Sequence, residues 1–350
     1  MIEPFIIGKI LALTTISFLL AITLTPAWTY VLYKYKLGKS LRDKKQAPIF
    51  HKMHAQKEGT PTMGGVLIWG TVLFTALSFA ALSVFFPSSV FAEMNFLSRS
   101  GTLLPLGALV AAGLIGLADD FFNVKRIGTH GGGIDIRHRL ILYTVIAIIG
   151  ALWFYLKLDW DLLHIPFLGS FNIGWWYIPL FVIVIVATSF SVNQTDGLDG
   201  LAGGTLVSAF VAFMFIAIFQ ERYDLATFCG VITGALIAFL WFNIFPARFF
   251  MGDTGAMSLG VTLGVIAMLT NTAFLLPVIG LVFVIEALAT IIQLVAKKIW
   301  KRKIFRVAPI HHHYEALGWP EPKVVMRFWL VSWIAAALGI ILFLLDIALI

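Results

Sequence analysis

Charged residues and cysteine are both scarce in this sequence. Only 12% of its 350 residues are charged, whereas 60% are hydrophobic. Soluble domains contain about 25% charged residues, so the composition excludes an ordinary soluble domain. The single cysteine, Cys229, lies in an apolar run, and a disulfide framework within the chain is therefore excluded. We expect one membrane-integral domain covering residues 1–350.

The apolar residues are grouped into runs that are long enough to cross a bilayer. A spanning helix needs about 20 mainly apolar residues. Ten runs qualify: 6–30, 63–86, 102–118, 140–156, 174–192, 201–219, 225–245, 254–269, 272–296 and 324–345. The pattern predicts an all-α polytopic membrane protein with ten transmembrane helices. The link at 159–173 contains Pro166, Gly169 and aromatic residues, and it predicts a small capping hairpin or loop.

Lysine and arginine are distributed unequally between the two sets of links. One set includes the strongly basic stretches 34–57, 125–139 and 297–306, whereas the other contains only Lys9, Arg99, Lys157 and Arg222. Cytoplasmic loops carry the excess of Lys and Arg, so the first set is predicted to be cytoplasmic and both termini to face outward. The same bias explains the net charge of +7, and we expect the lipid bilayer, not nucleic acid, as partner.

The unusual polar segments all fall on the predicted cytoplasmic side. They are 59–65, 119–123, 193–200, 243–255 and 308–315. Because five such segments meet at one membrane face, we expect them to form a single site.

Carboxylates dominate three of these segments. Asp119 and Asp120 close the third run, where a carboxylate opposes the helix dipole by about 0.3–1 kcal/mol. They are either an ordinary solvated helix end or a metal-binding or acid–base pair. Asp199 and Asp253 each precede an apolar run and are either helix caps or ligands. Asp196 lies three residues before Asp199, on the same face of a helical turn.

Three consecutive histidines form the most specific motif, in the run Ala-Pro-Ile-His-His-His-Tyr-Glu at 308–315. A zinc site is disfavoured, because consecutive side chains of a helix do not face one point and no cysteine is near. Imidazole donors suit a phosphate or diphosphate. Glu286 lies in the middle of a run, where an ionisable group is functional or paired by default. Gln293 lies two turns further along the same face.

The inventory of residues indicates the chemistry. Several carboxylates without a zinc set or a nucleophile elbow indicate Mg²⁺ and a phosphorylated substrate. Lys57 and the glycine-rich segment 59–65 offer an anion contact, although the order of residues is not that of a Walker loop. A site at the cytoplasmic membrane face can combine a soluble nucleotide substrate with a lipid phosphate, and phosphoryl transfer requires mainly positioning and charge neutralisation.

Five motifs resemble the phospho-N-acetylmuramoyl-pentapeptide-transferase family, within the polyprenyl-phosphate N-acetylhexosamine-1-phosphate transferase superfamily. They are 57–65 (KEGTPTMGG), the pair Asp119–Asp120, 193–201 (NQTDGLDGL), 241–255 (WFNIFPARFFMGDTG) and 308–329 (APIHHHYEALGWPEPKVVMRFW). They occur in the order found in the family. Two features depart from it: Gln194 replaces a small apolar residue, and the segment 126–138 is not lysine-rich.

The resemblance implies a reaction and a set of site residues. UDP-N-acetylmuramoyl-pentapeptide and undecaprenyl phosphate would give the lipid-linked peptidoglycan precursor and UMP at the bacterial inner membrane, and the family commonly forms homodimers. Asp253 resembles the Mg²⁺ ligand, with Asn193 reaching the metal. Asp119 resembles the base that deprotonates the lipid phosphate, and Asp120 supports the metal or that phosphate. The residues that match nucleotide, diphosphate or metal contacts are Lys57, Thr62, Asn193, Asp196, Gly197, Leu198, Asp199, Asn243, Phe250, Gln293, His311, His312 and His313.

Three alternative functions stay open at this point. The first is a sister transferase that moves N-acetylglucosamine-1-phosphate to a polyprenyl phosphate. The second is a membrane prenyltransferase, which would need a second aspartate-rich repeat. The third is an ion-coupled transporter with Glu286 in its pathway, although no internal repeat is visible.

Overall fold

The computed structural model describes residues 3–38, 57–98, 101–128 and 132–349. Part of the basic sequence on which the topology prediction relies lies outside these residues, namely Lys39, Arg42, Lys44, Lys45, Lys52 and Arg99.

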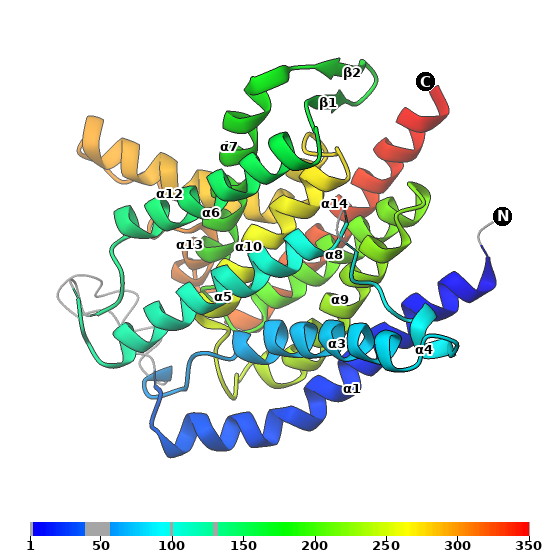
Figure 1. Cartoon of the computed structure of the whole chain (residues 1–350). Helices are drawn as coiled ribbons and strands as arrows, with labels where there is room; N and C mark the ends of the chain where they lie inside the picture. Colours follow the sequence, from blue (N-terminus) through cyan, green and yellow to red (C-terminus); the bar gives the residue numbers. More distant parts are fainter. Residues whose placement is uncertain (1–2, 39–56, 99–100, 129–131, 350) are drawn as a thin grey trace.

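The described residues form a helical bundle (Figure 1). The long helices are α1 (Pro4–Lys34), α3 (Gly65–Phe85), α5 (Leu103–Val124), α6 (Ile136–Lys157), α7 (Tyr177–Thr195), α8 (Leu201–Phe219), α9 (Tyr223–Asn243), α10 (Gly252–Leu269), α12 (Leu281–Ile299) and α14 (Glu321–Leu349). Short elements are α4 (Val90–Glu93), η2 (Gly174–Trp176), α11 (Leu276–Ile279) and α13 (Ile310–Ala316). Each of the ten predicted runs overlaps one of the long helices, although the bounds differ and the run 272–296 also contains the short helix α11.

Nine helices of the described part of the chain are long and apolar enough to cross a membrane, which confirms a polytopic membrane protein. The exception is α12, which contains Glu286 within it and Lys297 and Lys298 in its last turn. The prediction of one continuous helix over 272–296 is wrong, because Gly280 separates α11 from α12. Pro277 fixes the start of α11, and helical hydrogen bonding resumes when the Val284 N–H donates to the Gly280 carbonyl.

The acidic pair also lies differently from the prediction. The third run was expected to end at residue 118, but α5 continues to Val124. Asp119 and Asp120 are therefore inside the last two turns and buried, not at a solvated helix end. The opposing helix dipole is weaker there, and neighbouring elements must compensate the two carboxylates.

Helix α10 is the centre of the bundle, and every one of its residues is buried. It packs against α5, α7, α3 and α8. Small residues permit this density, because helices in membranes approach most closely where glycine leaves the backbone uncovered. A Cβ on Gly260 would stand 2.8 Å from the Cα of Ser189 on α7. Helix α10 is thus packed closely among the other helices.

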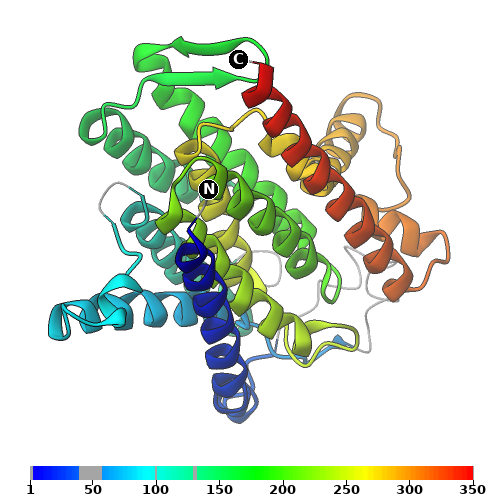
Figure 2. The same cartoon turned by 90° about the vertical axis from the view of Figure 1, so that its right-hand side faces the viewer.

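The link at 159–173 forms the expected hairpin, with β1 (Leu162–Ile165) antiparallel to β2 (Gly169–Asn172). It is tied to the end of α14, where the Phe167 N–H donates to Asp346 Oδ1 and His164 Nε2 lies 2.6 Å from Asp346 Oδ2. Two views of the structure show the hairpin beside this end of α14 (Figures 1 and 2). The start of α1 and the end of α14 lie on the same side of the bundle (Figure 1).

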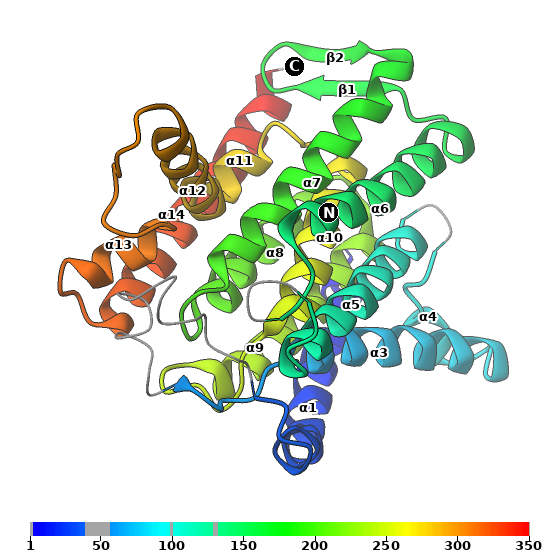
Figure 3. The same cartoon turned by 90° about the vertical axis from the view of Figure 1, so that its left-hand side faces the viewer.

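Helices α12, α13 and the first turns of α14 lie along one flank (Figure 3), where they contact one another. The histidine segment therefore approaches the bundle from a different side than α5 and α6. Figure 3 also shows the carboxyl end of α7 near this flank, and α12 packs on α7.

Candidate active site

The amino end of α10 is built from two glycine-rich segments. The Phe250 N–H donates to the Pro61 carbonyl, and the N–H groups of Gly64 and Gly65 donate to the carbonyls of Phe250 and Met251, each over 2.8 Å. A Cβ on Gly65 would collide with the backbone of Gly255. The glycines are therefore required for the close approach that places segment 61–65 against the start of α10.

Asp120 caps α10 from a different helix. Its Oδ1 accepts hydrogen bonds from the Asp253 N–H (3.1 Å) and the Thr62 hydroxyl (3.2 Å), and its Oδ2 accepts one from the Thr254 N–H (3.1 Å). Gly252 has φ +76°, and a Cβ there would collide with Asp120 Oδ2. These contacts satisfy the free N–H groups of the first turn. Asp120 and Thr62 therefore fix the position of Asp253.

Two helix-cap readings of the sequence do not hold. Asp253 lies in the first turn of α10, and the cap residue is Met251. Asp199 precedes the cap of α8, which is Gly200 in a left-handed conformation with φ +79°. Both carboxylates are thereby left for contacts outside their own helix.

Arg139, in the first turn of α6, lies between two acids. Its Nε lies 2.8 Å from Asp119 Oδ2, and its NH1 donates to Asp253 Oδ1 over 2.9 Å. Asp119 Oδ1 also accepts the Ile134 N–H over 2.5 Å, and the Asn193 amide lies 2.5 Å from Asp253 Oδ1. Arg139 thus joins two predicted site residues, Asp119 and Asp253, and a third, Asn193, contacts Asp253.

The oxygen groups at this point fit a magnesium ion. Within the residues described, no three His, Cys, Asp or Glu side chains form a complete metal cage. Mg²⁺ usually takes only one or two carboxylates and completes its shell with substrate phosphates and water. Asp253 can supply such a carboxylate and Asn193 an amide oxygen, while Arg139 pairs with both Asp253 and Asp119.

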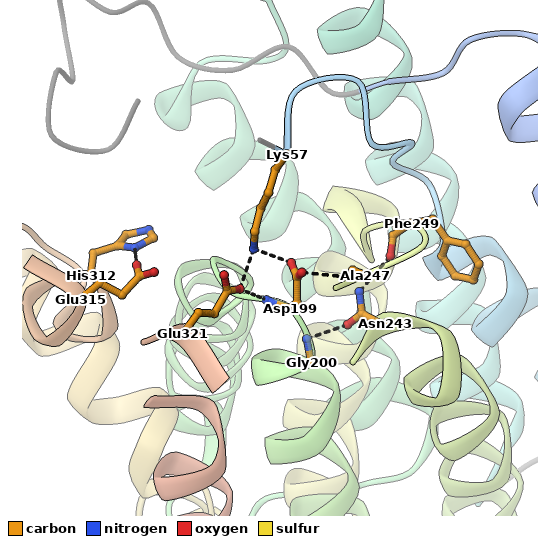
Figure 4. A network of polar contacts seen from close by, with 9 residues as sticks. All are labelled: Lys57, Asp199, Gly200, Asn243, Ala247, Phe249, His312, Glu315 and Glu321. Atoms are coloured by element: carbon orange, nitrogen blue, oxygen red, sulfur yellow. Dashed lines mark hydrogen bonds and ion pairs between the residues drawn. The ribbon is translucent and has the colours of Figure 1, made fainter. Parts of the chain in front are cut away.

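A second polar cluster surrounds Lys57 (Figure 4). Its Nζ lies 2.6 Å from Asp199 Oδ1 and 2.5 Å from Glu321 Oε1. Glu321 Oε1 accepts the Asp199 N–H, and Asp199 Oδ2 accepts the Ala247 N–H. Lys57 also lies 5.8 and 5.9 Å from the ring centroids of Phe245 and Phe250. The cluster joins four separate segments of the chain.

Asn243 completes this cluster. Its Oδ1 accepts the Gly200 N–H and its Nδ2 donates to the Phe249 carbonyl (Figure 4). On the other side of the same turn, the Trp329 indole N–H donates to the Gly200 carbonyl. The turn between α7 and α8 is therefore held from both sides.

The histidines divide into a pair and a single residue. His311 and His312 are buried, with ring centroids 4.1 Å apart. His313 instead packs against the Phe305 ring and accepts the Arg306 N–H. The expectation that consecutive side chains would not share one direction is correct for His313, whereas the other two rings are adjacent.

Other predicted contact residues support the loops. Leu198 packs with Leu201, Val324 and Val325 in a small apolar cluster. Gln293 accepts the N–H groups of Ile304 and Phe305 and donates to the Phe305 carbonyl.

Asp196 follows α7 and is half-buried, and Gly197 faces the histidine pair. Phe250 lies beside Lys57.

Sequence reasoning missed two central residues. Arg139 lies just after the atypical segment 126–138, whose basic residues had no assigned role. Glu321 stands between Pro320 and Pro322 at the start of the last span, and this unusual position was the available signal. Both are charged groups that the structure pairs with predicted site residues.

Acidic, basic and imidazole groups gather where the loops meet this bundle of apolar helices. Such an arrangement is that of a multi-pass membrane enzyme. Residues 102–271 match the model of glycosyl transferase family 4, and residues 57–68 match signature 1 of the phospho-N-acetylmuramoyl-pentapeptide-transferases. The second match includes Lys57, Thr62 and the glycines that pack on α10.

Similar curated proteins cover nearly the whole chain. The phospho-N-acetylmuramoyl-pentapeptide-transferase of Chloroflexus aggregans is 40% identical over 95% of this chain and 89% of its own length. Those of Geobacillus sp. (strain WCH70) and Bacillus anthracis are 39% and 38% identical over 93% of this chain and 95% of theirs. The chain belongs to the phospho-N-acetylmuramoyl-pentapeptide-transferase family.

Proposed function

We propose that this protein transfers phospho-N-acetylmuramoyl-pentapeptide from its UDP-linked donor to undecaprenyl phosphate, giving lipid I and UMP. The identity to the named relatives over nearly the entire chain supports the substrates. The observation that carries the chemistry is that Arg139 bridges Asp119 and Asp253 at the buried end of α10, with Asn193 in contact with Asp253. Negative groups held against a cation in this way suit the positioning and charge neutralisation of phosphoryl transfer.

In the proposed reaction, an oxygen of the lipid phosphate attacks the phosphorus that bears the sugar. The bond between the two donor phosphates breaks, and UMP leaves with the bridging oxygen. Asp119 accepts the proton of the lipid phosphate, and Arg139 exchanges its carboxylate contacts for phosphate oxygens. Attack at phosphorus leaves the anomeric configuration unchanged. We favour this direct displacement over a covalent phospho-aspartate intermediate.

A magnesium ion belongs to the same proposal. Asp253 and Asn193 would hold it, and a bound ion would neutralise charge on the transferring phosphates. Asp120 then acts indirectly, because its oxygens cap the turn that carries Asp253. Lys57, Asp199 and Asn243 shape the turn before α8, which we propose receives the nucleotide together with Asp196, Gly197, Phe250 and the histidines. Gln293 supports the loop that leads to those histidines.

An assay of UMP release tests the reaction. Full-length protein with undecaprenyl phosphate and Mg²⁺ is expected to release UMP with UDP-N-acetylmuramoyl-pentapeptide and much less with UDP-N-acetylglucosamine. Omitting Mg²⁺ is expected to abolish release. Turnover of the second donor alone would instead assign the sister transferase, and solute flux without UMP would assign a transporter.

We also propose that α12 is a tenth span in the bacterial inner membrane and that both termini face outward. Support comes from the position of the start of α1 and the end of α14 on one side of the bundle (Figure 1). An impermeant thiol reagent added from outside is expected to label Ser170→Cys, in the hairpin, but not Lys303→Cys, after α12, in a Cys229→Ser background. The reverse pattern would contradict this topology.

A further inference from the structure

Two neighbouring imidazoles each face a carboxylate. His311 Nδ1 lies 3.0 Å from Glu286 Oε2, and both side chains are completely buried. His312 Nδ1 lies 2.7 Å from Glu315 Oε2, a pair visible in Figure 4. The two pairs use different helices, since Glu286 belongs to α12 and Glu315 to α13 itself. Both rings therefore have the same nitrogen turned toward an acid.

The opposite ring nitrogens face the turn between α7 and α8. A Cβ on Gly197 would collide with His311 Nε2 and would stand 3.3 Å from His312 Nε2. Neither ring nitrogen of His311 makes a hydrogen bond among the described residues, although the side chain is not exposed at all; Nδ1 has the ion-pair contact with Glu286, and Nε2 has no such contact. A buried polar atom without a partner costs about 1–3 kcal/mol, so its retention beside a polar turn indicates a functional role.

Glu286 has no other evident reason for its position. It lies in an apolar helix, where a carboxylate is expensive unless it is paired. Glu286 Oε1 has no hydrogen-bond partner among the described residues. Within the same residues, the one ion-pair contact of Glu286 is with His311. The same face of α12 carries Thr290, which donates to Gln194, and Gln293, which holds the backbone at 304–305. This face of α12 thus supports the histidine segment and the end of α7.

We propose that Glu286 and Glu315 are positioning residues that hold His311 and His312 with both Nε2 atoms directed at the space over Gly197, where the imidazoles bind the donor diphosphate. A carboxylate beside Nδ1 fixes the orientation of the ring and leaves Nε2 as the nitrogen presented to the ligand, and an imidazole N–H can donate to a phosphate oxygen. The inference rests on the proposed function for the identity of the anion. The orientation of the rings is independent of it.

Substitutions at Glu286 in the full-length protein test the inference. Glu286→Leu is expected to raise the donor KM and lower kcat/KM by about 10- to 100-fold, by analogy with the loss of the carboxylate partner of a metal-binding histidine. Glu286→Gln keeps the shape of the side chain and one hydrogen-bond acceptor, so the loss of kcat/KM is expected to be smaller. Leu288→Ala, at a residue on the same helix that is 49% exposed, is the matched control and should behave as wild type.

A double-mutant cycle separates positioning from general stability. In a His311→Gln background, neither Glu286 substitution should change the kinetics further, because the group that it positions is gone. Additive losses would overturn the inference, as would wild-type kinetics of Glu286→Leu.

The ¹⁵N resonances of the histidine rings provide a readout that does not depend on turnover. The His311 signal is identified by its absence from the His311→Gln spectrum. In wild type it should show a protonated Nδ1, and Glu286→Leu should shift it toward the other tautomer or the neutral ring. Unchanged resonances would overturn the inference. If wild type releases no UMP, the proposed function fails while this spectrum still decides the role of Glu286.

Discussion

Asp253→Asn is expected to lower kcat for UMP release by about 10³-fold, a loss within the range for a group that acts on the reacting phosphates. Asp253 Oδ1 lies within 2.9 Å of both the Arg139 guanidinium and the Asn193 amide. The substitution removes the negative charge that pairs with Arg139 and that would also bind a magnesium ion. Mg²⁺ titration of UMP release is the measurement, and the residual activity of the variant should no longer depend on the ion.

Two further variants make this result specific. Asp224→Asn changes an acid in the first turn of α9, beside Lys9 near the start of α1, and should leave turnover within about twofold of wild type. Asp120→Ala should instead lower the melting temperature as well as activity, because loss of a helix cap costs about 0.5–2 kcal/mol. Normal Mg²⁺-dependent turnover of Asp253→Asn would contradict the assigned role.

Lys57→Met is expected to produce the largest loss of stability. The lysine lies within 2.6 Å of two carboxylates, and the side chains of Asp199 and Glu321 are only 3% and 8% exposed. Removing the cation leaves two buried acids facing each other, and breaking a buried ion pair costs about 3–5 kcal/mol. The thermal midpoint in detergent should fall, and the donor KM should rise because the turn before α8 loses its support.

The matched second-site variant is Glu321→Gln. Added to Lys57→Met, it removes the repulsion and should restore most of the thermal midpoint without restoring the donor KM. Lys125→Met, at an exposed lysine, should change neither quantity. If the double variant melted below Lys57→Met, or if Lys57→Met melted like wild type, the ion-pair explanation would be wrong.

The family was recognisable from short motifs because each serves a local backbone need. Gly64, Gly65 and Gly252 are required where segment 61–65 meets α10, and no larger residue fits. In the turn at 193–200, Gly200 begins α8 in a left-handed conformation that favours glycine. Such requirements are written in consecutive residues, and the matches to residues 57–68 and 102–271 reflect them.

The sequence by itself determined the transmembrane helices, since the length and polarity of an apolar run decide whether it is stable in a bilayer. Helix α8 has the predicted bounds, 201–219, and the hairpin lies in the predicted link. What only the tertiary structure decided is which charges meet. Arg139 and Asp253 are 114 positions apart in the sequence. Glu286 and His311 belong to α12 and α13, which an irregular segment separates. Such pairs depend on the relative rotation and height of packed helices, which no local periodicity specifies.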